Sequence, residues 1–142
     1  MTPVDPKYAH LKLKVLNAVY KYVLFENSLS FQQAIKTIME SVNDSPYSIF
    51  FTPDEKSAII PSTIEVGSIK AKDVSDWACI SVIGEMPFGT VEGLLATVAS
   101  VLKHEGIGNC VVSTYKTDLF FVRSKYLALA KQALKDAGWE FV

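Results

Sequence analysis

The order of the hydrophobic patterns in the second half of the chain constrains the fold most. β-Branched residues gather in short runs that favour strands, and apolar residues recur at helical spacing between these runs. The expected elements are a strand at 77–83, a helix that follows Gly89-Thr90 and ends at Gly106, strands at 107–114 and 119–123, a helix from Ser124 to Gly138, and a strand at 139–142. This β-α-β-β-α-β order is that of a ferredoxin-like unit, in which two helices cover one face of a four-stranded antiparallel sheet.

The first half of the chain repeats part of this plan. The expected elements are strands at 11–16 and 19–25 split by Asn17-Ala18, a helix from Phe31 to Val42, and strands at 47–51 and 57–60. Ser30 is the predicted N-cap of the helix, and Gln33 completes a capping box. We therefore predict an α+β fold of tandem ferredoxin-like βαββαβ lobes, with antiparallel sheets and helices on one face. The predicted N-terminal lobe covers residues 1–61, the connection 62–75, and the C-terminal lobe 76–142.

Charge and hydropathy exclude several classes of function. Among the 142 residues, 14 basic side chains nearly balance 15 acidic ones, and no cluster of lysines or arginines stands out. Nucleic acids and membranes are therefore not expected as partners, because a nucleic acid or an anionic membrane requires a concentrated basic patch. No run of about 18 apolar residues is present, and residues 1–10 lack the apolar stretch of a signal peptide. We expect a cytoplasmic protein.

The two cysteines favour a structural interpretation. Cys79 and Cys110 lie in apolar runs that are typical of strands, where buried free thiols are common. Two cysteines are too few for a disulfide scaffold, and no C-x-x-C spacing indicates thiol exchange. We predict two reduced thiols in the core.

No catalytic constellation is evident. The histidines are His10 and His104, and no serine or cysteine carries a nucleophile motif. The acidic pair Asp54-Glu55 lies in a predicted turn, where carboxylates are usually solvated or bonded to the backbone. Two distant histidines and two strand cysteines also lack the spacing of a metal site. We predict neither a catalytic site nor a metal or cofactor, although a small enzyme with an unrecognised site stays an alternative.

The loop at 84–89 has two interpretations. A glycine-containing loop between a strand and a helix can hold an anion with its backbone N–H groups. It is not a P-loop, because Gly89 is followed by Thr90 and Val91 and the lysine is missing. Gly84 and Gly89 either shape the turn or help to bind a carboxylate, and both interpretations stay open.

Three short motifs elsewhere in the chain carry a family resemblance. Residues 113–118, with the letters STYKTD, match an S-T-[YF]-x-[TF]-D hairpin, and residues 93–96, GLLA, match the small and apolar start of a helix. In the first half, residues 52–57, TPDEKS, match a T-x-D-E-x-S signature. The chain thus resembles the ACT domain family, in particular small two-lobe ACT proteins. It is also similar to the ACT repeats of the cytosolic arginine sensor upstream of the TOR kinase and, more distantly, to aspartokinase regulatory domains.

The resemblance implies a ligand site between a helix start and the hairpin. The residues implicated are Gly93 and Leu94 on one side, and Ser113, Thr114, Tyr115 and Asp118 on the other. The chemistry is reasonable on independent grounds, since the helix start from Thr90 offers N–H donors to a carboxylate and Asp118 offers acceptors to an ammonium. Each residue also has a plainer interpretation: hairpin stabilisation for Asp118, a surface aromatic for Tyr115, and close helix packing for Gly93.

We therefore expect a non-catalytic regulatory ACT protein that binds an amino acid or a related small metabolite. The site would lie between domains or between subunits, and a homodimer is expected because exposed sheet edges favour association. The regulated partner would be a separate protein. The alternative is a protein–protein interaction adaptor whose ligand pocket has degenerated.

Overall fold

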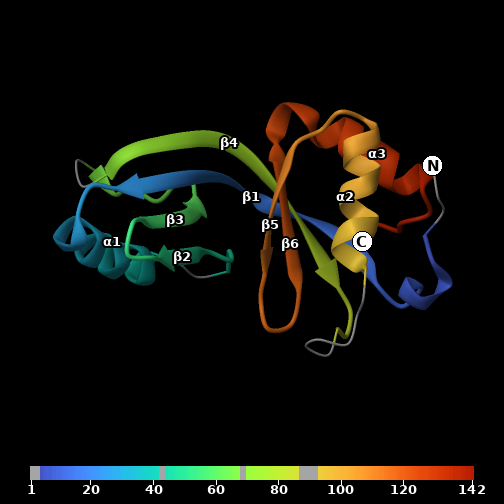
Figure 1. Ribbon diagram of the computed structural model, residues 1–142, viewed down its shortest axis with the longest axis horizontal. Helices are drawn as coiled ribbons and strands as arrows, with labels where there is room; N and C mark the ends of the chain where they lie inside the picture. Colours follow the sequence, from blue (N-terminus) through green and yellow to red (C-terminus); the bar gives the residue numbers. More distant parts are fainter. Residues whose placement is uncertain (1–3, 42–43, 68–69, 87–92) are drawn as a thin grey trace. The chain divides into compact units, whose positions relative to one another are not determined.

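The computed structural model describes residues 4–41, 44–67, 70–86 and 93–142 of the chain. The elements are η1 (Pro6–Tyr8), β1 (Lys12–Phe25), α1 (Ser28–Ser41), β2 (Ser48–Phe51), β3 (Lys56–Pro61), β4 (Lys70–Ile83), α2 (Leu94–His104), β5 (Asn109–Ser113), β6 (Asp118–Arg123), η3 (Ser124–Tyr126) and α3 (Leu127–Asp136) (Figure 1). The strand order is β2-β3-β1-β4-β6-β5. The pairs β1–β3, β2–β3 and β5–β6 are antiparallel, which confirms the α+β class. Among the described residues, no helix combines the length and hydropathy needed to cross a membrane.

Two compact units divide the chain in a way that the sequence did not predict. The discontinuous unit comprises Met1–Leu16 and Ala78–Val142, and the continuous unit comprises Asn17–Trp77. The break predicted at Asn17-Ala18 is wrong, because the two predicted strands form one strand, β1, which contributes to both units. The lobe boundaries predicted at 61 and 76 also differ from these units, since β4 already begins at Lys70 and likewise contributes to both.

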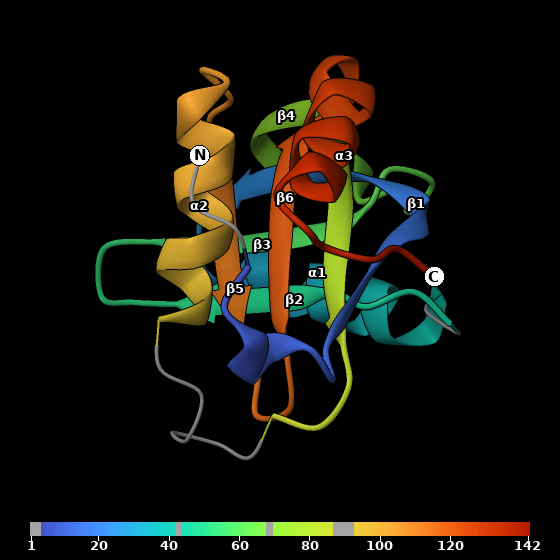
Figure 2. The same ribbon diagram turned by 90° about the vertical axis from the view of Figure 1, so that its right-hand side faces the viewer.

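The discontinuous unit places two helices on one face of its strands. Figures 1 and 2 both show α2 and α3 on the same side of β4, β5 and β6. The element order predicted from residue 77 onward agrees with the structure as far as α3. Alternate residues of β4 and β6 point into the core under these helices, together with the apolar stripe of α2. The buried core contains Leu13, Ala78, Ile80, Val82, Leu94, Val98, Val101, Leu102, Phe120, Val122, Ala130, Leu134 and Trp139, among others.

The predicted strand at 139–142 is reduced to a single bridge. Phe141 pairs in parallel with Leu13 of β1, and the backbone N–H of Leu13 donates to the carbonyl of Glu140 at 2.8 Å. In the strand order, β1 is the direct neighbour of β4. The neighbour of β4 opposite β6 is therefore an N-terminal strand.

The continuous unit has a smaller core under α1. It contains Val23, Phe25, Phe31, Ala34, Ile38, Ala58, Ile60, Ile64 and Val66. The predicted N-cap Ser30 is wrong, because the N–H of Ser30 donates to the side-chain oxygen of Asn27 at 2.9 Å, which makes Asn27 the cap. Between β3 and β4, Ile64 and Val66 contribute to this core.

The same four-residue loop closes a hairpin in each unit. In the loop at 52–55, the N–H of Thr52 donates to the carbonyl of Glu55 at 2.8 Å; in the loop at 114–117, the N–H of Thr114 donates to the carbonyl of Thr117 at 2.7 Å. Each threonine hydroxyl also accepts the N–H two residues further on, at 3.2 and 3.3 Å. The two halves of the chain therefore share a hairpin of the same length and internal bonding.

The cysteines differ in accessibility, and this difference predicts selective alkylation. Cys79 is fully buried in β4, and burial raises the pKa of its thiol to about 12. Since the thiolate is the nucleophile, we expect iodoacetamide at pH 8 to modify the half-buried Cys110 and to spare Cys79 until the protein unfolds, as measured by peptide mass spectrometry. The unfolded thiol ionises near pH ~8.5, so raising the pH beyond that value should also lower stability. Equal labelling of both cysteines in the folded protein would contradict this assignment.

Candidate functional site

The hairpin of β5 and β6 ends beside the C-terminal end of β4. The hydroxyl of Thr117 donates to the backbone carbonyl of Val82 at 2.6 Å, and Figures 1 and 2 both show the hairpin tip next to the end of β4. Ser113 and Asp118 form the last pair of the β5–β6 ladder. The structure thus brings four predicted site residues together in one hairpin end: Ser113, Thr114, Tyr115 and Asp118.

All hydrogen-bonding positions of the Thr114 hydroxyl are occupied within the loop. It donates to the carbonyl of Thr117 at 3.1 Å and accepts the N–H groups of Lys116 and Thr117 at 3.3 and 3.0 Å. A hydroxyl has one donor and two acceptor positions, so the side chain has no capacity left for a ligand. This side chain therefore organises the loop.

The other hairpin residues differ in exposure and bonding. Tyr115 is 76% exposed, as expected of a surface aromatic. Asp118 is half-buried, and within the described part of the chain its carboxylate forms no hydrogen bond or ion pair. An unpaired, partly desolvated carboxylate can accept hydrogen bonds from a cation. Asp118 is therefore the hairpin residue best suited to bind a charged group.

The start of α2 combines one exposed and one buried residue. Gly93 has a left-handed backbone with φ of 74°, and its carbonyl accepts both the N–H and the hydroxyl of Thr97 at 2.9 and 2.8 Å. A Cβ at Gly93 would lie 3.1 Å from the hydroxyl of Tyr8. Leu94 is buried in the core, so only its backbone could reach a ligand. Thr90 lies outside the described residues.

The N-terminal segment fixes the beginning of the loop that connects β4 to α2. Gly84 has φ of 126°, and a Cβ there would meet the side chain of Leu11 at 2.9 Å and the carbonyl of His10 at 3.0 Å. The imidazole of His10 donates from Nε2 to the carbonyl of Glu85 at 3.1 Å. Of the two interpretations of Gly84, this close approach supports turn shaping. No local sequence pattern indicates this role for residues 1–10, because the hydrogen bond joins positions 75 residues apart.

The acidic pair of the first hairpin is bonded locally, since the carboxylate of Glu55 accepts the hydroxyl of Ser57 at 2.7 Å. In the described ranges, no group of three or more His, Cys, Asp or Glu side chains could hold a metal ion.

Residues 74–136 match the model of the ACT domain family. The family resemblance inferred from the hairpin and helix-start motifs is thereby confirmed. No curated protein matches the chain.

Solved structures show where the same fold occurs. A protein from Agobacterium tumefaciens is 27% identical, with a TM-score of 0.71, over 94% of this chain and 92% of that one. A Vibrio cholerae protein of unknown function, described as a possible transport protein, is 18% identical, with a TM-score of 0.65 and 90% of both chains covered. The ligand-free regulatory subunit of aspartate kinase from Thermus thermophilus is 10% identical, with a TM-score of 0.61, over 87% of this chain and 95% of that one. The similarity to the Vibrio cholerae and Thermus thermophilus proteins shows the fold alone. The predicted likeness to aspartokinase regulatory domains is therefore confirmed as a likeness of fold.

Proposed function

We propose that this chain is a non-catalytic regulatory ACT protein that binds an amino acid or a related small metabolite at the hairpin of β5 and β6. The half-buried carboxylate of Asp118 is the observation that carries the proposal, because it has no partner in the described residues and would pair with the ligand ammonium. The backbone N–H groups at the start of α2, next to Gly93, would receive the ligand carboxylate. The aspartate kinase regulatory subunit is a regulatory relative in fold, which supports a regulatory role.

Two further parts of the proposal concern assembly. We take the continuous unit as a second ACT-like lobe, and the shared four-residue hairpin loop supports this pairing. A homodimer would complete the site between subunits. It is supported by the position of β5 at the end of the strand order, where, among the described strands, its backbone groups on one side have no neighbour. The regulated partner would be a separate protein, and a cytoplasmic location stays a prediction.

Ligand binding should raise the melting temperature and should depend on Asp118. We expect at least one of the twenty L-amino acids to stabilise the protein, since a ligand at roughly 100 times its Kd contributes about 2.7 kcal/mol, or several degrees in Tm. Asp118→Asn should remove that shift, and Asp54→Asn, which changes an acid in the matching loop at 52–55, should retain it. Differential scanning fluorimetry measures both. A silent panel, or equal shifts in both variants, would refute the hairpin site.

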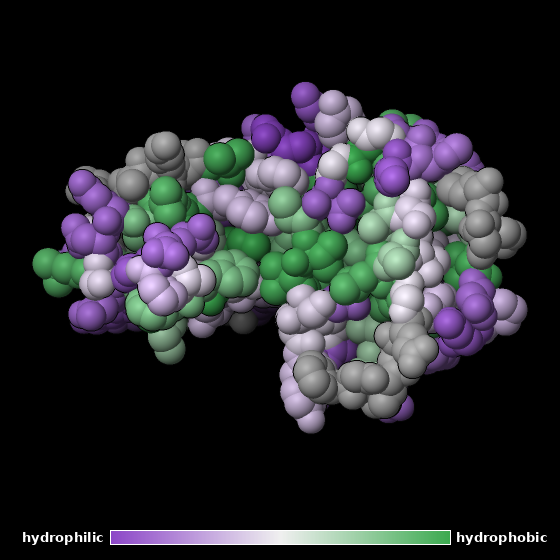
Figure 3. Space-filling model, in the orientation of Figure 1, coloured by the Kyte–Doolittle hydropathy of each residue, from purple (hydrophilic) through white to green (hydrophobic). Residues whose placement is uncertain are grey.

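The adaptor alternative has its own supporting observation. Three large apolar side chains of the continuous unit are more than 60% exposed: Leu29 and Met39 of α1 and Phe51 of β2. Figure 3 shows hydrophobic residues reaching the surface on the face drawn. Exposed apolar side chains can mark a protein-binding surface when they are contiguous. A silent amino-acid panel together with a polypeptide that co-purifies with the protein and is lost on Phe51→Ser would favour the adaptor.

A further inference from the structure

The hairpins of the two units end at equivalent pairs of residues. Ser113 and Asp118 form the last pair of the β5–β6 ladder, and Phe51 and Lys56 form the last pair of the β2–β3 ladder. Each pair flanks a loop of four residues, and the two loops have the same internal hydrogen bonds. Lys56 of the continuous unit is therefore the counterpart of Asp118 in the discontinuous unit.

Both counterparts lie on the face of the sheet that faces the core of their own unit. Asp118 and Phe120 are two residues apart in β6, and Phe120 belongs to the core under α2 and α3. Lys56 and Ala58 are two residues apart in β3, and Ala58 belongs to the core under α1. Side chains alternate between the two faces of a strand, so each charged residue lies on the same face as its core neighbour. The two charges therefore occupy the same place in the two units.

The charges at equivalent hairpin positions are opposite in sign. Asp118 corresponds to Lys56, and by the same count Lys116 of one loop corresponds to Asp54 of the other. One hairpin end carries a cation followed by an anion, and the other carries an anion followed by a cation. Two such hairpin ends that meet in the same orientation bring unlike charges together at both positions. This pattern is the electrostatic complementarity expected of two surfaces that bind each other.

Neither Asp118 nor Lys56 has a counter-ion among the described residues. The carboxylate of Asp118 forms no hydrogen bond or ion pair there. The ammonium of Lys56 lies 5.0 Å from the ring centroid of Phe51, and within the same part of the chain it likewise forms no hydrogen bond or ion pair. Both residues are half-buried, so each has lost part of its contact with water without gaining an opposite charge. An opposite charge from outside the chain would stabilise each of them.

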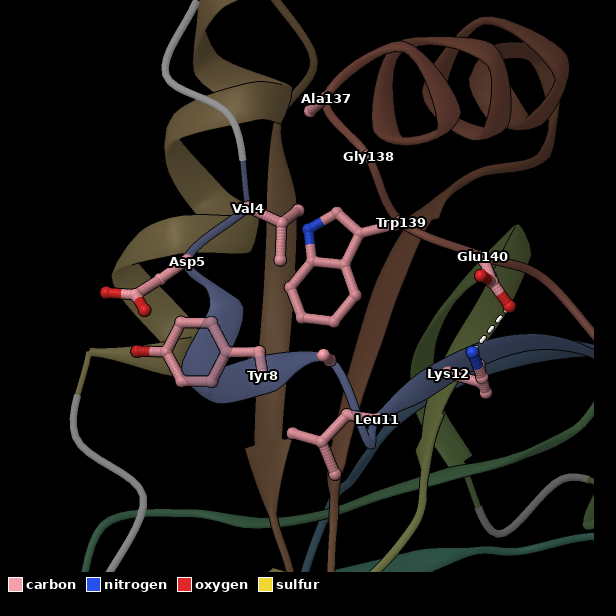
Figure 4. A pocket seen from close by; sticks show the side chains of 10 residues that line it. Val4, Asp5, Tyr8, Leu11, Lys12, Ala137, Gly138, Trp139 and Glu140 are labelled. Carbon is pink, nitrogen blue, oxygen red and sulfur yellow. Dashed lines mark hydrogen bonds and ion pairs between the residues drawn. The ribbon is translucent and has the colours of Figure 1, made fainter.

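The ionic groups around the cavity of the discontinuous unit are different, because they are paired within the chain. This cavity has a volume of about 220 Å³ and is lined by residues between 4 and 12 and by residues 137–140 (Figure 4). The ammonium of Lys12 and the carboxylate of Glu140 face one another beside it. The carboxylate of Asp5 accepts the backbone N–H of Lys7 at 2.9 Å. The hairpin ends are therefore the better candidates for a contact with another molecule.

An exposed aromatic side chain accompanies the charges at each hairpin end. Tyr115 is 76% exposed and Phe51 is 67% exposed. The ring of Phe51 is supported from below by Phe31 of α1, with ring centroids 6.4 Å apart. Aromatic side chains are enriched in protein interfaces, where they exclude water from neighbouring polar contacts. Contact between the two kinds of hairpin end would bury apolar surface next to the ion pairs and strengthen them.

We propose that the β2–β3 hairpin end of a second copy of this chain docks on the β5–β6 hairpin end. Lys56 of the second copy pairs with Asp118, and Asp54 of the second copy pairs with Lys116. The exposed pair of Asp54 and Lys116 fixes the register and contributes little affinity, whereas the half-buried pair of Lys56 and Asp118 carries the contact. The inference rests on the proposed homodimer and names the residues that the second copy brings to the hairpin site.

Charge reversal and mixing test the pairing. Lys56→Asp and Asp118→Lys should each weaken self-association roughly tenfold or more, because each replaces attraction between copies with repulsion. An equimolar mixture of the two variants should associate within about threefold of the wild-type chain, because Asp118 of one variant meets Lys56 of the other. Sedimentation velocity over a concentration series measures the dissociation constants. Rescue on mixing requires contact between separate chains, so it excludes a contact within one chain.

Control variants test whether the effect is specific to the hairpins. Lys36→Asp and Glu105→Lys reverse exposed charges outside the hairpins and should leave self-association within about threefold of the wild-type value. Circular dichroism reports whether each variant is folded. If a reversal prevents folding, Lys56→Gln and Asp118→Asn take its place, and each should weaken self-association by about threefold or more. Equal losses in the control variants would overturn the proposal.

The other outcomes separate this contact from the proposed ligand site. A wild-type chain that stays monomeric, a dimer that is insensitive to both reversals, or a mixture that stays dissociated would each overturn the hairpin contact. None of these measurements uses a ligand. A silent amino-acid panel with rescue on mixing would refute the ligand site alone, and a responsive panel without rescue would refute the hairpin contact alone.

Discussion

Leu13→Ala is expected to lower the free energy of unfolding by about 2–5 kcal/mol, because it empties a fully buried position in the core of the discontinuous unit. Leu24→Ala is the matched control on the same strand. Leu24 is 38% exposed, so its truncation should cost about 1 kcal/mol or less. Urea unfolding monitored by circular dichroism measures both values.

The comparison tests which unit the N-terminal strand residues stabilise. A large loss for Leu13 alone is expected if residues 1–16 complete the core that also contains Phe120 and Trp139. Equal, small losses for the two leucines would show that the N-terminal segment contributes little to that core. The described arrangement of β1 would then be wrong in its first half.

Gly84→Ala is expected to destabilise the protein by about 3 kcal/mol or more. Its φ of 126° is a conformation that side-chain-bearing residues rarely adopt, and such strain alone costs roughly 1–3 kcal/mol. The added Cβ would also lie 3.0 Å from the carbonyl of His10, and a backbone atom cannot move away as easily as a side chain. Thermal unfolding followed by circular dichroism would measure the loss.

Gly108→Ala provides the control for this substitution. No atom lies within 4 Å of a Cβ built at Gly108, and its backbone is outside the left-handed region. We expect a change within about 0.5 kcal/mol. Similar effects of both substitutions would mean that the N-terminal segment does not pack against the loop after β4.

Local patterns explain what the sequence predicted correctly. The run of β4, α2, β5, β6 and α3 follows from periodicity and glycine stops, which depend on residues close together in the chain. The hairpin at 113–118 was recognisable for the same reason. The N-cap of α1 was misplaced because Ser30 and Asn27 are both good capping residues. The sequence alone does not decide at which of them the helix begins.

Contacts between distant positions explain what the sequence did not predict. His10 bonds to Glu85 and Lys12 pairs with Glu140, across separations of 75 and 128 residues. No local pattern encodes such pairs, so the cavity and the role of the N-terminal segment were missed. The apolar residues Tyr8, Leu11 and Leu13 were the available signal, since all three are buried, although they lie outside the recognised motifs. The carboxylate of Asp118 was found only through the family resemblance.

The passage of β1 and β4 through both units has a consequence for the order of synthesis. The continuous unit is an uninterrupted segment, so all its packing partners leave the ribosome together. The core that contains Leu13 is different, because Phe120, Leu134 and Trp139 are translated more than a hundred residues later. Until then Leu13 has no core to join. The first strand therefore completes its packing only after the last helix has been made, because its first half belongs to the core that contains Phe120, Leu134 and Trp139.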